Sequence, residues 1–143
     1  MNTPVTNDNL DPALPPELAA LADRLSGEAD VRLAIVFGSV AAGTAGFDSD
    51  VDLAVMLDRR MDAARRMTLL QLVAEVTGRP VDLVDLRDAG VAVMRAALEE
   101  GRMLLCRDRR DYFMLLSKMV TDAEDFLPLY ERVLAERRKA WIG

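Results

Sequence analysis

The sequence predicts an α/β or α+β fold in which helices pack on a small sheet, and three observations carry this prediction. Four short runs rich in β-branched and apolar residues are typical of strands. Segments with apolar residues at helical spacing separate these runs. The 143 residues, 51% of them hydrophobic and 29% charged, suit one folded domain that needs no disulfide or structural metal. Strands that alternate with helices favour a sheet covered by those helices.

Residues 1–16 are expected to form a flexible N-terminal arm, because they include four prolines and no long apolar run. Residues 17–143 are then expected to form a single domain. Helical order is predicted to begin where Pro15 and Pro16 set the first turn, since Leu18, Leu21 and Leu25 follow at helical spacing. Gly27 is expected to end this helix.

The elements that follow are predicted from apolar runs and the residues that interrupt them. Val31–Phe37 is apolar on both faces after its second residue, which is typical of an interior strand. Gly38–Ser39 and a turn-rich loop separate it from the strand Val51–Leu57, with one short helical turn between. Met61–Thr77 has the spacing of an amphipathic helix. The remaining elements are the strand Val81–Leu86, a helix over about Ala89–Glu100 and the strand Arg102–Cys106.

The C-terminal part, from about Arg109 to Trp141, is predicted to be helical, with a kink at Pro128 because proline removes a backbone donor. Its apolar stripe has two interpretations: a core face, or a surface that docks a partner or a second copy of the chain. We expect the part beyond Pro128 to dock, since a small sheet offers limited area to so many large side chains. The stripe consists of Leu116, Met119, Val120, Ala123, Phe126, Leu127, Tyr130, Val133, Leu134 and Trp141.

The composition excludes several classes of protein. There is no histidine, which excludes Ser-His-Asp hydrolases, Cys-His proteases and His-ligated zinc enzymes. A formal net charge of −6 argues against a nucleic acid as the main partner, because phosphate neutralisation needs a basic face. The single cysteine, Cys106, lies in an apolar run and is expected to be buried. No signal peptide and no membrane span are recognisable, so a cytoplasmic protein is expected.

Two carboxylates stand where the second predicted strand begins. Asp50 and Asp52 are separated by one residue, so on a strand they point to the same face about 6.5–7 Å apart. Such oxygens suit Mg²⁺, which takes few protein ligands and completes its shell with water and substrate phosphates. Gly38 lets the backbone approach a phosphate, and Ser39 offers an N–H and a hydroxyl. The pattern therefore predicts a site for a nucleotide and a hard cation.

A third carboxylate is expected from the next strand, where Asp82 and Asp85 have opposite parity. A charge inside an apolar strand is costly when unpaired, and a cation shared with Asp50 and Asp52 would remove that cost. Asp82 repeats the Val-Asp-Leu context of Asp52 and is therefore predicted as the third ligand. Asp85 is assigned a structural role, and Ser49 is expected to cap the turn before Asp50.

Four arginines near the start of the predicted helix Met61–Thr77 have two interpretations. They could reach the nucleotide, or they could form a solvated face, which is the commoner situation for charges around a helix start. They are Arg59, Arg60, Arg65 and Arg66.

The order of these residues resembles the minimal nucleotidyltransferases of the polymerase-β-like superfamily, and in particular the antitoxins of HEPN/MNT toxin–antitoxin pairs. The resemblance rests on Gly38-Ser39, ten further residues, Asp50-x-Asp52 and then Asp82 on a later strand. It implies a small mixed sheet flanked by helices, with a long C-terminal helical segment. It also implies that Gly38 and Ser39 bind the triphosphate, that Asp50, Asp52 and Asp82 hold Mg²⁺, and that Asp82 helps to activate the acceptor hydroxyl.

The resemblance also implies an activity and a partner. Members of the superfamily transfer a nucleoside monophosphate, usually AMP from ATP, to a hydroxyl and release pyrophosphate. In the antitoxin branch the acceptor is a tyrosine of a cognate HEPN ribonuclease toxin, which the modification silences, and the C-terminal helices are candidates for the contact between chains. Two alternatives stay open: transfer to a small-molecule hydroxyl, and a non-catalytic antitoxin that acts by binding alone.

Overall fold

The computed structural model describes residues 14–46, 49–122 and 133–138 of the chain. Four strands form one sheet in the order β3–β2–β1–β4. β1 runs antiparallel to both of its neighbours, whereas β2 and β3 are parallel, so the sheet is mixed. The strands are β1 (Val31–Phe37), β2 (Val51–Leu57), β3 (Val81–Asp85) and β4 (Arg102–Cys106). The fold class is the one that the sequence predicts.

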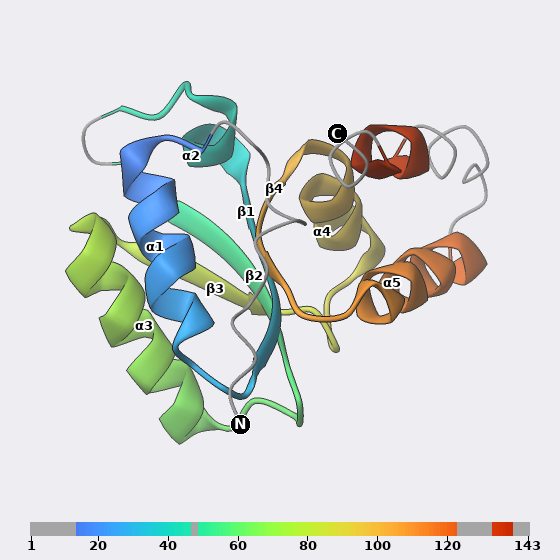
Figure 1. The fold of residues 1–143 in the computed structure, drawn as a ribbon, viewed down its shortest axis with the longest axis horizontal. Coiled ribbons are helices and arrows are strands. Elements are labelled where there is room, and N and C mark those ends of the chain that lie inside the picture. The colour runs from blue at the N-terminus through green and yellow to red at the C-terminus, as the bar shows by residue number, and fades with distance from the viewer. Residues whose placement is uncertain (1–13, 47–48, 123–132, 139–143) are drawn as a thin grey trace.

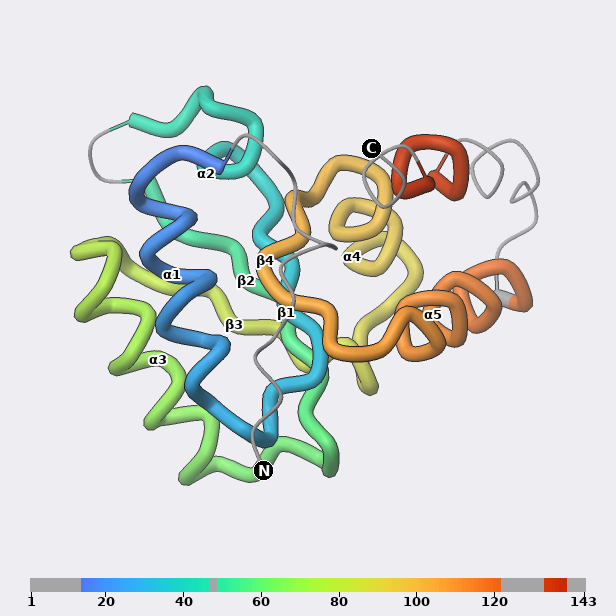
Figure 2. The backbone as a smooth tube through the Cα atoms, viewed as in Figure 1, coloured from blue at the N-terminus to red at the C-terminus, as the bar shows by residue number. Residues whose placement is uncertain are grey.

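Helices cover both faces of this sheet. Figure 1 shows α1 (Pro16–Ser26) and α3 (Ala63–Thr77) side by side on one face. On the other face lie α4 (Val91–Arg95), its continuation as the π-helical turn η2 (Ala96–Glu100), and α5 (Arg109–Asp122). The short helix α2 (Gly38–Ala42) follows β1 at one end of the sheet, and residues 133–138 are again helical. The tube in Figure 2 passes from β1 directly into α2 and then returns through β2.

The sheet separates two apolar cores, and the alternation of side chains along β2 shows how. Val51, Leu53 and Val55 are buried in the core beneath α1 and α3. Ala54 and Met56 are buried in the core on the α4 and α5 side. Because side chains on a strand alternate between faces, Asp52 belongs to the second face, beside Ala54.

The strand boundaries agree closely with the sequence predictions, and the helix boundaries differ for identifiable reasons. β1 and β2 have the predicted limits. α3 begins at Ala63 rather than Met61, because the Asp62 carboxylate accepts a hydrogen bond from Arg65 N at 2.7 Å and caps the helix there. The predicted helix over residues 89–100 begins after Gly90 and changes from α to π geometry at Ala96.

The predictions for the N-terminal and C-terminal segments agree with the structure only in part. Leu14 packs against the first core, and α1 begins at Pro16, where the two prolines predict the first helical turn. Residues 1–13 lie outside the described residues. Leu116, Met119 and Val133 are all buried in the second core. The expectation that the stripe docks a partner beyond residue 128 is therefore wrong at Val133, which the core needs. Pro128, where a kink is predicted, lies outside the described residues. So do five positions of the stripe: Ala123, Phe126, Leu127, Tyr130 and Trp141.

Two further expectations concern burial. Cys106 is buried, as its apolar context predicts, and burial raises the pKa of its thiol to about 11. Within the described part of the chain, none of the helices has the length and apolar character needed to cross a bilayer.

Candidate functional site

β1 is followed by a glycine in a backbone conformation that other residues rarely adopt. Gly38 has a φ of +73° and is the first residue of α2. Its neighbour on β2 is Asp52, which pairs in register with Phe37. A Cβ atom on Gly38 would overlap Oδ2 of the Asp52 carboxylate. The absence of a side chain is thus what lets the loop backbone lie directly against this carboxylate.

Ser39 is the second residue of α2, next to that glycine. The turn after it is closed by Thr44, whose N–H donates to the Ser39 carbonyl at 3.0 Å, and by Gly43 at a φ of +76°. Ser39 is half-buried. The two residues predicted to contact phosphate therefore sit at the same end of the sheet as Asp52.

The carboxylates of β2 and β3 meet at this end. Asp52 and Asp82 are direct register partners on two parallel strands, so they share a face and their backbones are about 4.8 Å apart. Asp50 lies just before β2 and has the same parity. Burial, then the charge of Asp82 and then that of Asp50 raise the pKa of Asp52. The structure therefore brings the predicted carboxylates close enough for their charges to act on one another.

The carboxylates Asp50, Asp52 and Asp82 could supply some, but not all, of the ligands of a hard divalent cation. Carboxylate oxygens of like charge are the kind of ligand that Mg²⁺ takes, and a cation would relieve the repulsion at Asp52. Among the described residues, however, no three acidic or thiol side chains are already gathered into a complete metal cluster. Such a set requires oxygens from water or from a bound phosphate to complete a coordination shell.

Asp85 lies on the opposite face from this group. Its side chain is buried and accepts hydrogen bonds from Arg87 N at 3.0 Å and from Met61 N at 3.4 Å. These contacts tie the turn after β3 to the segment before α3. Asp85 is therefore part of the framework, and of the two aspartates of β3 only Asp82 is on the face of Asp52.

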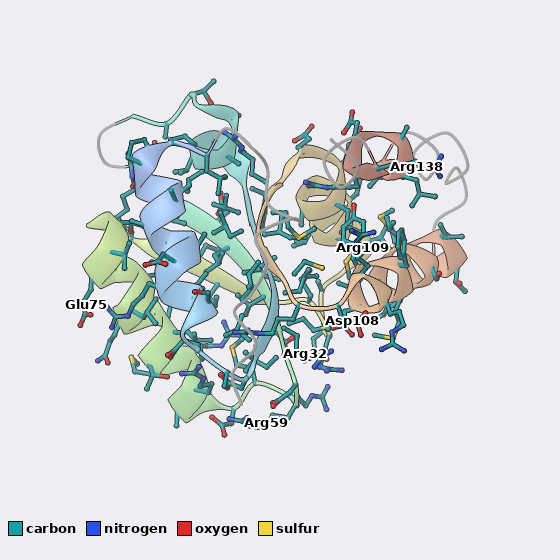
Figure 3. The ribbon with its side chains drawn as sticks, in the orientation of Figure 1. Arg32, Arg59, Glu75, Asp108, Arg109 and Arg138 are labelled. Carbon is teal, nitrogen blue, oxygen red and sulfur yellow. The ribbon has the colours of Figure 1, made fainter. Side chains whose placement is uncertain are left out.

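The four arginines around the start of α3 form ion pairs and hydrogen bonds within the fold. Arg65 pairs with Asp30 at 2.6 Å, and Arg66 donates to the Leu83 carbonyl at 2.6 Å. Arg60 pairs with Asp88 at 2.8 Å. Arg59, labelled in Figure 3, lies at the end of the sheet opposite α2. The interpretation that these side chains belong to a structural and solvated surface fits their contacts.

Two polar residues near Asp50 organise the preceding loop. Ser49 Oγ accepts a hydrogen bond from Gly46 N at 2.8 Å, which is the turn-capping role expected for it. Arg79, which no motif singles out, donates to the carbonyl oxygens of Gly46 at 2.8 Å and Ser49 at 3.3 Å. These contacts join residues about thirty positions apart, so no local spacing in the sequence announces them.

The fold and this site together define a class: a mixed sheet whose strand ends present a glycine-serine turn beside acidic side chains, as in phosphate-transfer enzymes. A match to the family model described as "Polymerase beta, Nucleotidyltransferase" over residues 20–110 gives the family. The chain belongs to this nucleotidyltransferase family.

Comparisons with individual proteins agree with this membership. The chain is 29% identical over 108 residues to the protein adenylyltransferase MntA of Shewanella oneidensis, covering 76% of this chain and 72% of that protein. A chain from a crystal structure of a toxin–antitoxin with AMP-PNP superposes with a TM-score of 0.64 at 27% identity, covering 85% of this chain and 93% of that one. A tri-AMPylated Shewanella oneidensis HEPN toxin in complex with its MNT antitoxin gives 0.58 at 24% identity, covering 86% and 91%, and supports the fold.

Proposed function

We propose that this chain is a Mg²⁺-dependent adenylyltransferase antitoxin that transfers AMP from ATP to a tyrosine hydroxyl of a cognate HEPN ribonuclease toxin. The observation that carries the proposal is the placement of Asp52 between Gly38 and Asp82, where backbone and like charges converge. The name of the relative, a protein adenylyltransferase, and the AMP-PNP and AMPylated toxin in similar complexes support the choice of reaction and partner. We also propose that the chain acts in the cytoplasm.

Each residue of the site has one role in this proposal. Gly38 and Ser39 bind the triphosphate, since the glycine leaves the backbone open to a close approach. Asp50, Asp52 and Asp82 would hold Mg²⁺. The metal, when bound, supplies charge neutralisation on the phosphoryl oxygens and orients the leaving group. Asp82 also faces outward from the sheet, as an exposed side chain, and is suited to accept a proton from the incoming hydroxyl.

The bonds exchanged are those of a nucleotidyl transfer. The tyrosine oxygen of the partner forms a bond to the α-phosphorus of ATP. The bond between that phosphorus and the oxygen that bridges to the β-phosphate breaks, and pyrophosphate leaves with this oxygen. The proton of the hydroxyl passes to the Asp82 carboxylate and from there to water. Catalysis by the chain then consists of positioning and electrostatic stabilisation.

The test is a transfer assay on the complete chain with its HEPN partner, ATP and Mg²⁺. Mass spectrometry of the partner should show an added AMP on tyrosine, and the partner's ribonuclease activity should fall in parallel. Asp52→Asn is the inactive comparison, and Asp85→Asn is the matched control because Asp85 lies on the other face.

Three outcomes decide between the alternatives. Modification by the wild type and by Asp85→Asn but not by Asp52→Asn supports the proposal. Inhibition of the ribonuclease by Asp52→Asn as strongly as by the wild type, with no mass change in either, would establish an antitoxin that acts by binding alone. AMP transfer to a small hydroxyl compound but never to the partner would contradict the protein acceptor.

A further inference from the structure

We propose that Arg79 is a positioning residue that holds Asp50 in place for metal and nucleotide binding. The inference rests on the proposed function for the chemistry, but its structural basis is independent of the acceptor. Among the three predicted ligands, Asp52 and Asp82 lie within strands and are fixed by the ladder of the sheet. Asp50 precedes β2, so something other than the ladder must set its position.

The backbone of Arg79 is itself anchored at the end of α3. Gly78 ends that helix with a φ of +66°, and its N–H donates to the Ala74 carbonyl at 2.8 Å. The hydroxyl of Thr77 accepts from Arg79 N at 3.2 Å and donates to the Val73 carbonyl at 2.8 Å. The position from which the guanidinium extends is therefore set by the helix.

The guanidinium of Arg79 bridges α1 and the loop before β2. Nε donates to Glu17 Oε1 at 2.7 Å, and Nη1 donates to the carbonyl oxygens of Gly46 at 2.8 Å and Ser49 at 3.3 Å. The side chain is only 18% exposed, and Glu17 opposite it is 32% exposed. The planar donor fork of arginine suits several oxygens at once, which the single ammonium of lysine does not.

These contacts surround Asp50 on both sides along the chain. The carbonyl of Ser49, directly before it, accepts from Arg79. The amide of Val51, directly after it, donates to the carbonyl of Pro80 at 2.8 Å. Residues 79 and 80 therefore hold both neighbours of Asp50. Removing the guanidinium releases one of the two and leaves the carboxylate free to move relative to Asp52.

The test compares four variants of the complete chain. Arg79→Ala removes the guanidinium, Arg79→Lys keeps the charge with fewer donors, and Glu17→Gln weakens the partner that orients it. Arg24→Ala is the matched control, because Arg24 also links α1 to α3, through Glu75 at 3.7 Å, but its side chain is 54% exposed. Thermal unfolding shows that each variant is folded.

Three measurements are made on each variant. Amide hydrogen exchange at Ser49 and Asp50 reports whether the segment is held. Calorimetry with AMP-PNP, with and without Mn²⁺, reports how much the metal strengthens nucleotide binding. Steady-state transfer kinetics separate kcat from KM for ATP.

We expect Arg79→Ala to speed exchange at Ser49 and Asp50 and to reduce the gain from Mn²⁺ by about tenfold, the usual loss when a group that orients a metal ligand is removed. The value of kcat should fall by a similar factor, with a smaller change in KM. Arg79→Lys should recover part of each effect, Glu17→Gln should lie between wild type and Arg79→Ala, and Arg24→Ala should match the wild type.

Unchanged exchange at Ser49 and Asp50 in folded Arg79→Ala, or an unchanged gain from Mn²⁺, would overturn the inference. An equal loss in Arg24→Ala would also overturn it, because the effect would then be one of general stability. Should the wild type transfer no AMP to a protein while the exchange and Mn²⁺ results are as expected, the acceptor assignment fails and the role of Arg79 stands.

Discussion

The two ends of the β1–β2 pair carry aspartates in opposite electrostatic settings. At the start of β1, Asp30 accepts hydrogen bonds from Arg65, and these contacts hold its pKa below the usual range. At the other end, burial and the charge of Asp82 raise the pKa of Asp52. Among the described residues no cationic side chain forms an ion pair with Asp52. One end of the sheet is thus neutralised for stability, and the other retains negative charge that a ligand can neutralise.

The opposite pKa shifts of Asp30 and Asp52 have opposite effects on the free energy of unfolding. A carboxyl group with a lowered folded-state pKa stabilises the chain above its unfolded value of 3.8, and this contribution is lost as the pH falls through the folded value. A carboxyl group with a raised folded-state pKa favours folding only when protonated, so its ionised form opposes folding at neutral pH. Asp30 belongs to the first kind and Asp52 to the second.

The largest expected effect comes from neutralising the charged end. Asp52→Asn should lower the rate of AMP transfer by about a hundredfold or more, since clamping of a metal on phosphoryl oxygens contributes several kcal/mol. Thermal unfolding at pH 7 should show equal or higher stability, because an ionised group under repulsion is removed, and the difference should shrink as the pH falls through the raised pKa of Asp52 towards 3.8. Retained transfer in this folded variant would contradict the metal assignment.

The second prediction concerns the end of the sheet where Arg65 pairs with Asp30. Arg65→Met should lower the free energy of unfolding by about 1–3 kcal/mol, because Asp30 and Glu28 lose a largely buried partner. Transfer per folded molecule should be unchanged, since these residues lie at the end of the sheet away from α2. Denaturant unfolding at pH 7 and a transfer assay measure the two quantities. A loss of transfer without a loss of stability would mean that the two ends are not separate.

A third prediction uses the two aspartates of β3, which differ in the face they occupy. Asp82→Asn should reduce transfer by about tenfold or more while leaving the unfolding free energy nearly unchanged. Asp85→Asn should do the reverse and cost about 1 kcal/mol of stability, because buried hydrogen bonds to two backbone amides are weakened. The reverse pair of phenotypes would show that the assignment of roles is wrong.

The smallest effect is expected at Ser39. Ser39→Ala should weaken ATP binding by about 0.5–1.5 kcal/mol, the value of one hydrogen bond, and by more if the hydroxyl contacts a charged phosphate oxygen. Calorimetry with ATP and Mg²⁺ measures this, with Ser26→Ala as a control for loss of a serine hydroxyl elsewhere. Equal affinities for wild type and Ser39→Ala would remove the hydroxyl from the binding site.

The sequence predicted this fold wherever the signal is local. β1 and β2 are apolar except at their second residue and have a glycine or a charged residue beyond each end, so their limits follow from the sequence pattern. Asp82 and Asp85 both lie in a Val-Asp-Leu context, so this context does not separate them; the parallel register of β2 and β3 does, because it places Asp82 beside Asp52. The roles of these residues in catalysis stay predictions.

Features that depend on distant contacts were not predictable in the same way. The burial of Val133 depends on where residues 133–138 pack, and Arg137 in that segment reaches the Gly101 carbonyl at 2.7 Å. The bridging contacts of Arg79 join three separate parts of the chain. The change from α to π geometry at Ala96 also has no distinguishing residue pattern.

The position of β4 at the edge of the sheet has a consequence for how the chain folds. β4 pairs with β1 through contacts such as Leu33 with Cys106, so this half of the sheet closes only after most of the chain has been made. Ile35 and Met56, on the face that α4 and α5 later cover, have no cover in a nascent chain that ends at β3. We therefore expect β1, β2 and β3 with α1 and α3 to assemble first, and the apolar face left open until then to be the stage at which newly made chains aggregate most readily.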